Sequence, residues 1–212
     1  MKYYLSSYKF GNKRKQLIEL APKNKIAIIP NALDFRGADN ERTLESLENK
    51  KLRLRESGFD PEVIDLKDYF GQSGQLKKII EGKGAVFVLG GNVFVLRQAM
   101  KLSGLDDIIV DLDANPDFLY AGYSAAGCVL APSLRPYSIV DDSSLVAYKE
   151  IKEVIWEGLG LVDFAFMPHW RSDHPESEAI EKEIEYCEKH HIKYKAVRDG
   201  EVLLFNSKNP LN

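Results

Sequence analysis

Short apolar segments that alternate with amphipathic stretches are the feature that most constrains this fold. KIAIIP (25–30), GAVFVL (84–89) and FLYAG (118–122) are apolar at almost every position, which predicts strands buried on both faces. Charged stretches with helical spacing separate them, such as residues 40–57, which Gly58 ends. The pattern predicts an α/β fold: a three-layer sandwich with a mostly parallel central sheet and helices on both faces.

The same periodicities predict the remaining elements. Segment 194–205 is expected to be a hairpin that turns at Asp199-Gly200, because this pair suits a type I′ turn. No repeat, low-complexity tract or Pro/Gly linker interrupts the chain, so residues 1–212 are expected to form a single α/β hydrolytic domain. Further strands are predicted at 2–6, 60–66 and 164–167, and helices at 14–20, 72–81, 94–103, 125–131 and 177–190.

Composition excludes several classes of protein. The net charge of -3 offers no strong field for nucleic acid or an anionic membrane surface. The N-terminus MKYYLSSYKF lacks the features of a signal peptide, and no apolar stretch is long enough to cross a membrane. The two cysteines, Cys128 and Cys187, favour reduced thiols over a disulfide scaffold. We therefore expect a cytoplasmic protein, monomeric or homodimeric, without nucleic-acid or membrane partners.

Ser124 lies in the most informative segment, YAGYSAAG (120–127). An apolar strand runs directly into small residues and then into an apolar helix, the sequence of a nucleophile elbow. Gly122 and Ala126 stand two residues before and after the serine, where the sharp turn leaves room only for small side chains. The N–H of Ala125 is then an oxyanion donor. The alternative is a glycine-serine turn that merely packs a helix against a strand.

The loop Gly90-Gly91-Asn92 also follows an apolar strand and precedes a helix. Both loops are therefore expected at the carboxyl ends of parallel strands, where open α/β sheets bind ligands. Gly91 is expected to bring a second N–H to the substrate oxygen. Asn92 is expected either to bind substrate or to cap the helix that follows, and the cap is the more common role for this residue type.

A serine hydroxyl needs a general base, and His169 is the preferred candidate among four histidines. It follows a predicted strand, which holds it rigidly, whereas His174 is expected to cap the next helix or lie exposed, and His190 and His191 to lie on the surface. The acid that orients the imidazole is expected to be Asp141, or else Asp142, in a stretch between nucleophile and base.

The ordered motifs of this chain resemble the peptidase E (dipeptidase E) family. They are GGN followed by F at 90–94, GYSAAG (122–127), APSLR (131–135), IVD (139–141) and MPHW (167–170). The resemblance covers residues 25–206 and implies the class I glutamine-amidotransferase-like fold. It assigns the nucleophile to Ser124, the catalytic histidine to His169, the oxyanion hole to Gly91 and Ala125, and substrate contact to Asn92.

The resemblance also implies a substrate class. Known members cleave dipeptides or short peptides that begin with aspartate, and cyanophycinase is a relative. Arg135 and Arg171, near the predicted loops, are candidates to bind the aspartyl carboxylate, the alternative for each being a surface ion pair. The stretch in which the family carries its catalytic aspartate is shortened here between Arg135 and Ile139, which leaves Asp141, Asp142 or a glutamate, Glu150 or Glu157, as the acid.

The predicted chemistry is acyl transfer to Ser124 with His169 as base, on a small peptide substrate and without cofactor or metal. A non-catalytic binding or regulatory member of the same fold is the alternative. A carboxylate within hydrogen-bond reach of His169 Nδ1 would separate the two. A cysteine-dependent glutaminase is disfavoured, because serine stands at the elbow and Cys128 follows one helical turn later, where a buried apolar role is expected.

Overall fold

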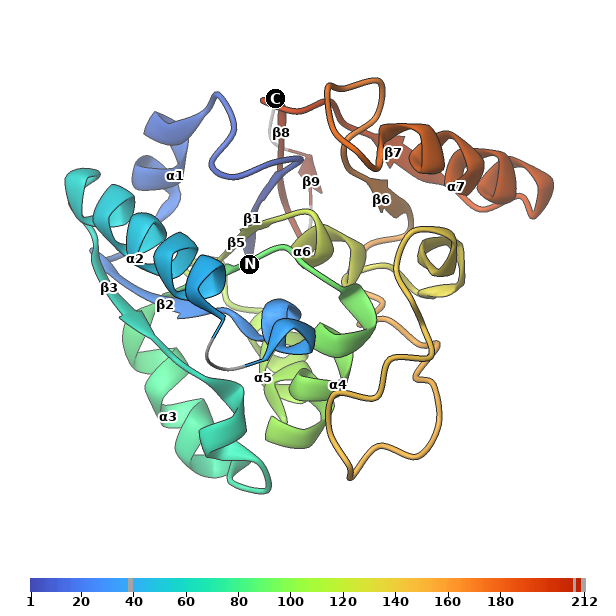
Figure 1. Ribbon diagram of the computed structural model, residues 1–212. Coiled ribbons are helices and arrows are strands. Elements are labelled where there is room, and N and C mark those ends of the chain that lie inside the picture. Colours follow the sequence, from blue (N-terminus) through green and yellow to red (C-terminus); the bar gives the residue numbers. More distant parts are fainter. Residues whose placement is uncertain (38–39, 208, 211–212) are drawn as a thin grey trace.

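The computed structural model describes residues 1–37, 40–207 and 209–210, built around a seven-stranded sheet. Its strand order is β3-β2-β4-β5-β1-β8-β9 (Figure 1). The first five strands are parallel, β8 pairs antiparallel with β1, and β9 pairs antiparallel with β8. A separate parallel pair consists of β6 and β7. The strands are β1 (Lys2–Ser6), β2 (Lys25–Ile29), β3 (Asp60–Val63), β4 (Ala85–Val88), β5 (Leu119–Tyr123), β6 (Ala165–Met167), β7 (Tyr194–Ala196), β8 (Val202–Asn206) and β9 (Asn209–Pro210).

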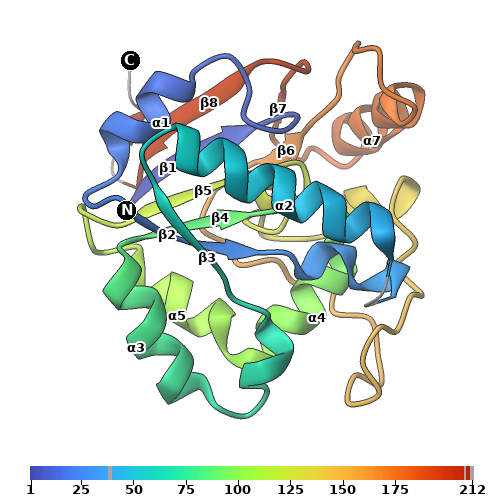
Figure 2. The ribbon, with the colours of Figure 1, turned by 60° about the vertical axis from the view of Figure 1, so that its left-hand side comes forward.

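Helices cover both faces of the sheet, as the apolar strands require. Helices α1 (Arg14–Leu20) and α2 (Glu41–Glu56) lie on one face, and α3 (Ser73–Lys83), α4 (Val93–Ser103) and α5 (Leu105–Leu112) lie on the other (Figure 2). The predicted three-layer α/β fold is thus confirmed. The remaining helices are α6 (Ala125–Cys128), α7 (Ser177–Lys189) and the 3₁₀ turns η1 (Asn31–Arg36), η2 (Leu66–Tyr69) and η3 (Arg135–Ile139).

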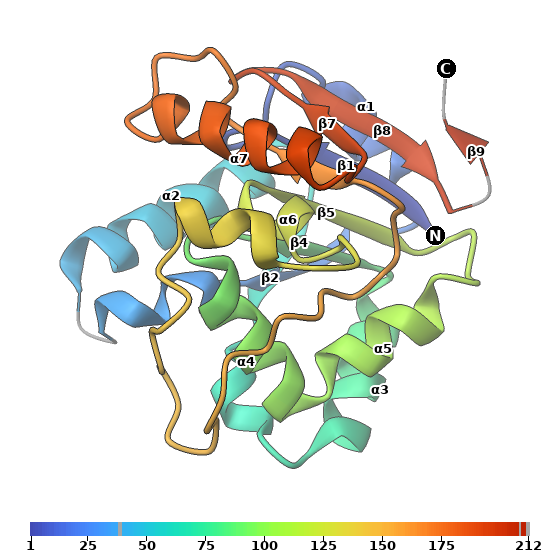
Figure 3. The same ribbon diagram turned by 90° about the vertical axis from the view of Figure 1, so that its right-hand side faces the viewer.

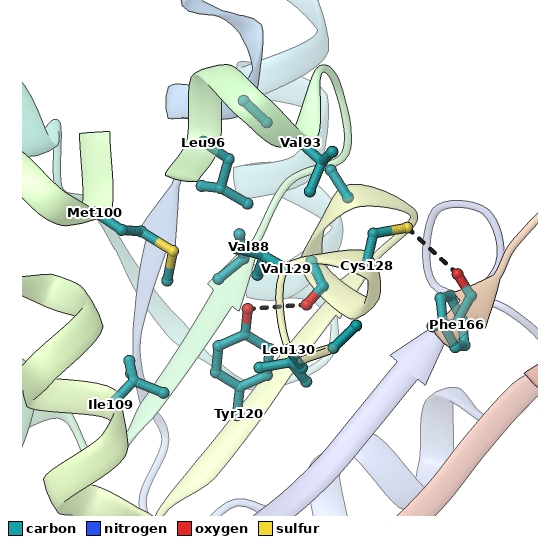
Figure 4. Close-up of a cluster of buried hydrophobic side chains, with 14 of the residues drawn as sticks. Val88, Val93, Leu96, Met100, Ile109, Tyr120, Cys128, Val129, Leu130 and Phe166 are labelled. Carbon is teal, nitrogen blue, oxygen red and sulfur yellow. Dashed lines mark hydrogen bonds between the residues drawn. The ribbon is translucent and has the colours of Figure 1, made fainter. Parts of the chain in front are cut away.

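The alternation of side chains along each strand divides the core into two clusters. In β1, Tyr3 and Leu5 join the cluster on the side of α3 to α5, and Tyr4 joins the cluster beneath α1 and α2. Figure 4 shows part of the first cluster, where Tyr120 of β5 and Met100 of α4 lie among aliphatic side chains. The continuous apolar runs of the sequence therefore reflect strands that are covered on both faces.

Two regions differ from the sequence prediction. The helix α5 was not predicted; Gly104, in the left-handed conformation at φ 76°, ends α4 and begins α5 within one residue. The predicted hairpin at 194–205 is wrong, because β7 pairs with β6 and β8 pairs with β1. No helix in the described part of the chain is long and apolar enough to cross a membrane.

Candidate active site

A cavity of about 510 Å³ opens where β1, β2, β4 and β5 end. The segments that follow these strands line it, together with α2, the loop after η3 and residues around α7. In Figure 3, α7 lies beside β7, with α6 near the carboxyl end of β5. The volume of the cavity falls in the range of pockets that bind small molecules. The cavity also lies at the carboxyl ends of the strands, where open α/β sheets bind ligands.

Ser124 directly follows β5 and has the backbone geometry expected of an elbow. Its φ of 52° and ψ of -113° are rarely adopted by a residue with a side chain, and the surrounding turn must hold them. The Ser124 N–H donates to the Ser6 carbonyl at the end of β1, at 3.2 Å, and the Ser124 carbonyl accepts from Gly127 and Cys128. The strained turn thus presents the serine side chain to the cavity.

The small residues on either side of Ser124 are sterically required. A Cβ atom on Gly122 would lie 2.4 Å from both the Ala126 Cβ and the Val88 carbonyl oxygen. Gly127 packs equally closely, because its added Cβ would lie 2.4 Å from the Phe166 ring. The sequence expectation that only small side chains fit two residues before and after the serine is thereby explained by direct contact.

Gly122→Ala is expected to lower the free energy of unfolding by about 2 kcal/mol and the melting temperature by roughly 4–8 °C, because Val88 backbone must move. Thermal denaturation measures the change. Gly82→Ala is the matched control, since its Cβ would meet nothing within 4 Å and alanine favours the helix; this variant is expected to melt at the same temperature or higher. Equal melting temperatures for the two variants would contradict the steric argument.

The backbone of Gly91 lies against η1 across the cavity floor. Gly91 has φ 152°, and a Cβ there would lie 2.3 Å from the Ala32 carbonyl oxygen, so a side chain is excluded. The neighbouring Gly90 approaches the elbow, with an added Cβ 3.1 Å from the Ser124 Cβ. Gly91 and Ala125 both line the cavity beside the serine. Helix α6 spans only Ala125–Cys128, so its backbone N–H groups matter more than a helix dipole.

Asn92 caps α4, which is one of the two roles expected for it from the sequence. Its side-chain oxygen accepts from the N–H groups of Phe94 (2.9 Å) and Val95 (3.0 Å), and its amide nitrogen donates to the Asp142 carbonyl at 3.2 Å. Asn92 borders the cavity but is 4% exposed. Its polar atoms therefore hold the Gly90-Gly91 loop in place and join it to the segment after η3.

His169 follows β6 and is buried at the cavity, with 2% of its surface exposed. Its Nδ1 donates to Asp199 Oδ1 at 2.7 Å, which leaves Nε2 as the basic nitrogen. Burial, and then the neighbouring His174, lower the pKa of His169, and the Asp199 carboxylate partly opposes this shift. A base with a pKa below its usual range is neutral, and so able to accept a proton, at neutral pH.

Asp199 and Ser7 were not identified from the sequence. Ser7, fully buried just after β1, accepts from the His169 N–H at 2.7 Å and donates to Asp199 Oδ1 at 2.7 Å. The Asp199 N–H in turn donates to Ser172 Oγ at 2.8 Å. The Asp199-Gly200 pair by itself predicts only a turn. In the structure this turn joins strands of two sheets and brings the Asp199 carboxylate to His169.

Asp141 does not occupy the position that the sequence analysis gave it. Its Oδ2 accepts from the Val93 N–H at 2.7 Å, at the start of α4, and the bond to His169 Nδ1 is made by Asp199. Asp142 is exposed and bonds to Ser144. Glu150 and Glu157 are exposed and do not line the cavity. The shortened segment after Arg135 therefore brings none of these carboxylates to the imidazole.

His174 stacks on His169 and also accepts hydrogen bonds at the start of α7, close to the capping role expected for it. The two ring centroids lie 3.7 Å apart with an interplanar angle of 10°, and His174 Nδ1 accepts from the Glu176 N–H at 3.3 Å. One donor atom from each of His169, His174 and Glu176 lies within 4.8 Å of the others, a group of the kind that can hold a metal. Parallel stacked rings direct their nitrogen lone pairs in parallel planes, which disfavours a shared metal ion. His190 and His191 are exposed, as predicted.

The two predicted arginine anchors lie outside the cavity. Arg135 lies over the Trp156 ring at 4.6 Å, and Arg171 lies over Trp170 at 4.8 Å and pairs with Glu181. Both arginines therefore make surface contacts, the alternative to substrate binding given for them in the sequence analysis. The cationic side chains that do line the cavity are Lys9, Arg36 and Lys50.

Lys50, on α2, is the buried cation of this group, with 7% of its surface exposed. Its ammonium lies over the Tyr123 ring, 5.5 Å from the centroid, next to the elbow. Among the residues that the structure describes, no carboxylate forms a salt bridge with it. Burial, followed by the charges of Lys9 and Arg53, lowers the pKa of Lys50. A buried cation in this state is stabilised by an incoming anion.

Cys128 and Cys187 are both buried, and neither forms a disulfide. The Cys128 Sγ donates to the Phe166 carbonyl at 3.5 Å (Figure 4), and burial raises the pKa of the thiol well above its usual value. A thiol held in its protonated form is a poor nucleophile. This agrees with the buried apolar role expected for Cys128.

Comparison with known proteins identifies the family. The sequence model of peptidase family S51 matches residues 6–210. The curated "Uncharacterized peptidase Lmo0363" of Listeria monocytogenes is 28% identical over 147 residues, which are 69% of this chain and 68% of that protein. "Uncharacterized peptidase Lin0382" of Listeria innocua is 30% identical over 87 residues, 41% of this chain and 39% of the relative.

Solved structures share the fold. A protein of Listeria monocytogenes EGD-e described as a candidate peptidase E superposes with a TM-score of 0.76 at 21% identity, covering 99% of this chain and 96% of its own. A peptidase from an acI-B1 Actinobacterium gives a TM-score of 0.59 at 14% identity, covering 86% and 74%. The fold is common to all three proteins, and the family match spans the elbow, the histidine and the rest of the cavity. The chain therefore belongs to peptidase family S51, the peptidase E family of serine peptidases.

Proposed function

We propose that this peptidase hydrolyses short peptides, above all dipeptides that begin with aspartate, with Ser124 as nucleophile, His169 as base and Asp199 as the acid that orients the base. One observation carries the proposal. A serine on a strained strand-to-helix turn and an imidazole fixed by a carboxylate at 2.7 Å line the same cavity. This combination is the one that acyl transfer to serine requires.

In the proposed reaction, His169 Nε2 takes the proton of the Ser124 hydroxyl as the oxygen attacks the peptide carbonyl. The N–H groups of Gly91 and Ala125 hold the negative charge that develops on the carbonyl oxygen. His169 then passes the proton to the leaving amine, and a water molecule, activated by the same nitrogen, releases the acyl group and restores the serine. Asp199 accepts the Nδ1 hydrogen bond and keeps that proton in place.

The alternative of a non-catalytic binding protein loses its main support. That alternative requires an imidazole without a carboxylate partner, whereas Asp199 Oδ1 lies 2.7 Å from His169 Nδ1. The Nδ1–H bond selects the tautomer with a free Nε2, which is the form that catalysis uses and that a binding protein has no need to fix.

The cationic side chains of the cavity support a preference for aspartate. Lys50, rather than Arg135 or Arg171, is the residue proposed to bind the aspartyl carboxylate. Its buried ammonium lacks a salt bridge to any described carboxylate and lies beside Tyr123, the residue before the nucleophile. A substrate carboxylate there gains a charge-assisted contact away from water. Lys9 and Arg36 are exposed, line the same cavity and add to its positive potential.

Lys50→Met tests this preference on the dipeptides Asp-Leu and Ala-Leu. The wild type is expected to have the higher kcat/KM for Asp-Leu, and the variant to lose about 10–100-fold on Asp-Leu with little change on Ala-Leu, the magnitude typical of a charged hydrogen bond. Lys51→Met, one residue along α2 and paired with Glu48, is the matched control. Equal wild-type rates on both dipeptides, or an unchanged ratio in Lys50→Met, would reject the aspartyl preference.

A further inference from the structure

The side of the cavity formed by α7 and the loop after η3 is acidic. Asp141, Glu176 and Glu183 line it, whereas the lining cations come from the loop after β1, from η1 and from α2. Helix α2 packs through Leu54 into one core cluster and α7 packs through Ile180 and Ile184 into the other. Figure 1 shows α2 and α7 on opposite sides of α6, the helix that begins after Ser124. The cavity is thus divided by charge.

Glu183 is the unexplained group on the acidic side. It is 1% exposed, and its Oε2 atom has no hydrogen-bond partner among the described residues. A carboxyl oxygen that is buried without a partner destabilises the fold unless something else compensates, so its presence at a cavity wall needs a reason. An incoming hydrogen-bond donor that enters the cavity would supply the missing partner.

The surroundings of Glu183 select the charge of that donor. Burial, and then the charges of Asp141 and Glu176 from the preceding loops, disfavour the ionised form of Glu183, and a hydrogen bond from the Val140 backbone partly opposes this. Cys128 of α6 and Tyr137 of η3 also lie within the electrostatic influence of Glu183. Burial raises the pKa of Asp141 to about 7 and the pKa of Glu183 well above its usual value. Neither carboxyl has a cationic partner among the described residues. A cation is the ligand that lets both ionise together.

We infer that Glu183, with Asp141, binds the α-ammonium group at the N-terminus of the substrate peptide. This inference rests on the proposed function, because the first peptide bond is the one that Ser124 then attacks. The α-nitrogen is two bonds from the scissile carbonyl carbon, so its binding site must adjoin the nucleophile. Asp141 and Glu183 line the same cavity as Ser124, which satisfies that condition.

The site makes the enzyme an exopeptidase that requires a free N-terminus. An N-acetylated peptide has no positive charge to offer and adds bulk against a buried wall. With a free peptide, the ammonium supplies the positive charge that stabilises both carboxylates, and a proton released on binding leaves to solvent. Lys50 and Glu183 then recognise opposite charges of one zwitterionic substrate.

The test compares Asp-Leu with N-acetyl-Asp-Leu on the wild type, on Glu183→Gln and on Glu185→Gln. Glu185 is exposed two residues along α7 and is the matched control. For the wild type, kcat/KM is expected to fall at least about 100-fold on acetylation. Glu183→Gln is expected to raise KM for Asp-Leu about 10–100-fold with a smaller change in kcat, because an amide keeps the shape of the acid and loses its charge. Glu185→Gln is expected to match the wild type.

A purely structural role for Glu183 gives a different result. A carboxyl that is always protonated is well imitated by glutamine, so Glu183→Gln would then leave KM unchanged, and this outcome overturns the inference. Equal hydrolysis of both peptides by the wild type overturns it as well, while leaving the proposed hydrolysis intact.

Calorimetry separates failure of the inference from failure of the proposed function. Ser124→Ala is expected to bind Asp-Leu and to lose about 10-fold or more in affinity when Glu183→Gln is added. Hydrolysis of neither peptide by the wild type would reject the proposed function, and the binding measurement would still decide the ammonium site. Equal binding of Asp-Leu and N-acetyl-Asp-Leu to Ser124→Ala would overturn the inferred ammonium site.

Discussion

Ser124→Ala is expected to lower kcat for Asp-Leu by about 10⁵-fold or more, because no other side chain can take the acyl group in its place. Cys128, the cysteine that lines the cavity, is buried, and burial raises the pKa of its thiol well above the usual value. The KM of the variant is expected to change little, since the backbone donors and charged side chains remain. Steady-state hydrolysis with purified protein measures both constants.

Labelling with a fluorophosphonate checks the same residue independently of substrate. The wild type is expected to be labelled at one site, and Ser124→Ala to remain unlabelled while melting at a temperature close to that of the wild type. Ser6→Ala is a less suitable control because Ser6 is fully buried and bonds to the Lys9 carbonyl. Ser73→Ala, at the exposed start of α3 and outside the lining of the cavity, is the better control. Labelling that persists in Ser124→Ala would reject the nucleophile.

Asp199→Asn is expected to lower kcat by about 10³–10⁴-fold with a small change in KM. An asparagine amide in place of the carboxylate favours the wrong imidazole tautomer and removes the charge that stabilises the imidazolium. The Asp199 carboxylate raises the pKa of His169. Its removal therefore lowers that pKa further, and the acidic limb of the pH profile of kcat/KM is expected to move to lower pH.

Two other aspartates provide the comparison for Asp199. Asp163→Asn, at an exposed position paired with Lys193, is expected to leave kcat and KM unchanged. Asp141→Asn is expected to act on KM rather than on kcat, because Asp141 bonds to the start of α4 and faces the acidic side of the cavity. A loss of kcat in Asp141→Asn as large as that in Asp199→Asn would return the orienting role to Asp141.

Periodicity predicted most of the fold, since it reflects which faces of each element are buried. The helix at 14–20 and the strand at 2–6 were predicted with their observed bounds. The hairpin at 194–205 failed because local turn chemistry cannot reveal the partner of a strand. Residues 194–196 pair with β6 and residues 202–206 with β1, and both partners are distant in sequence.

The same limit applies to the candidate site. Ser124 and the glycines around it are found from the sequence because the elbow is a local motif of consecutive residues. Asp199 is not found, because its contact with His169 spans 30 residues and its contact with Ser7 spans 192. Lys50 and Glu183 look like surface positions of charged amphipathic helices, and only burial at a shared cavity distinguishes them.

The turn at Asp199 has a consequence for how enzymatic activity is acquired during folding. It connects β7, paired with the strand before His169, to β8, paired with the strand before Ser7, so the carboxylate arrives only when both pairings have formed. Closing so long a loop is entropically slow. A nascent or partly refolded chain that already has its elbow is therefore still unable to cut peptides. Recovery of hydrolysis during refolding consequently reports the pairing of β8 with β1 and of β7 with β6.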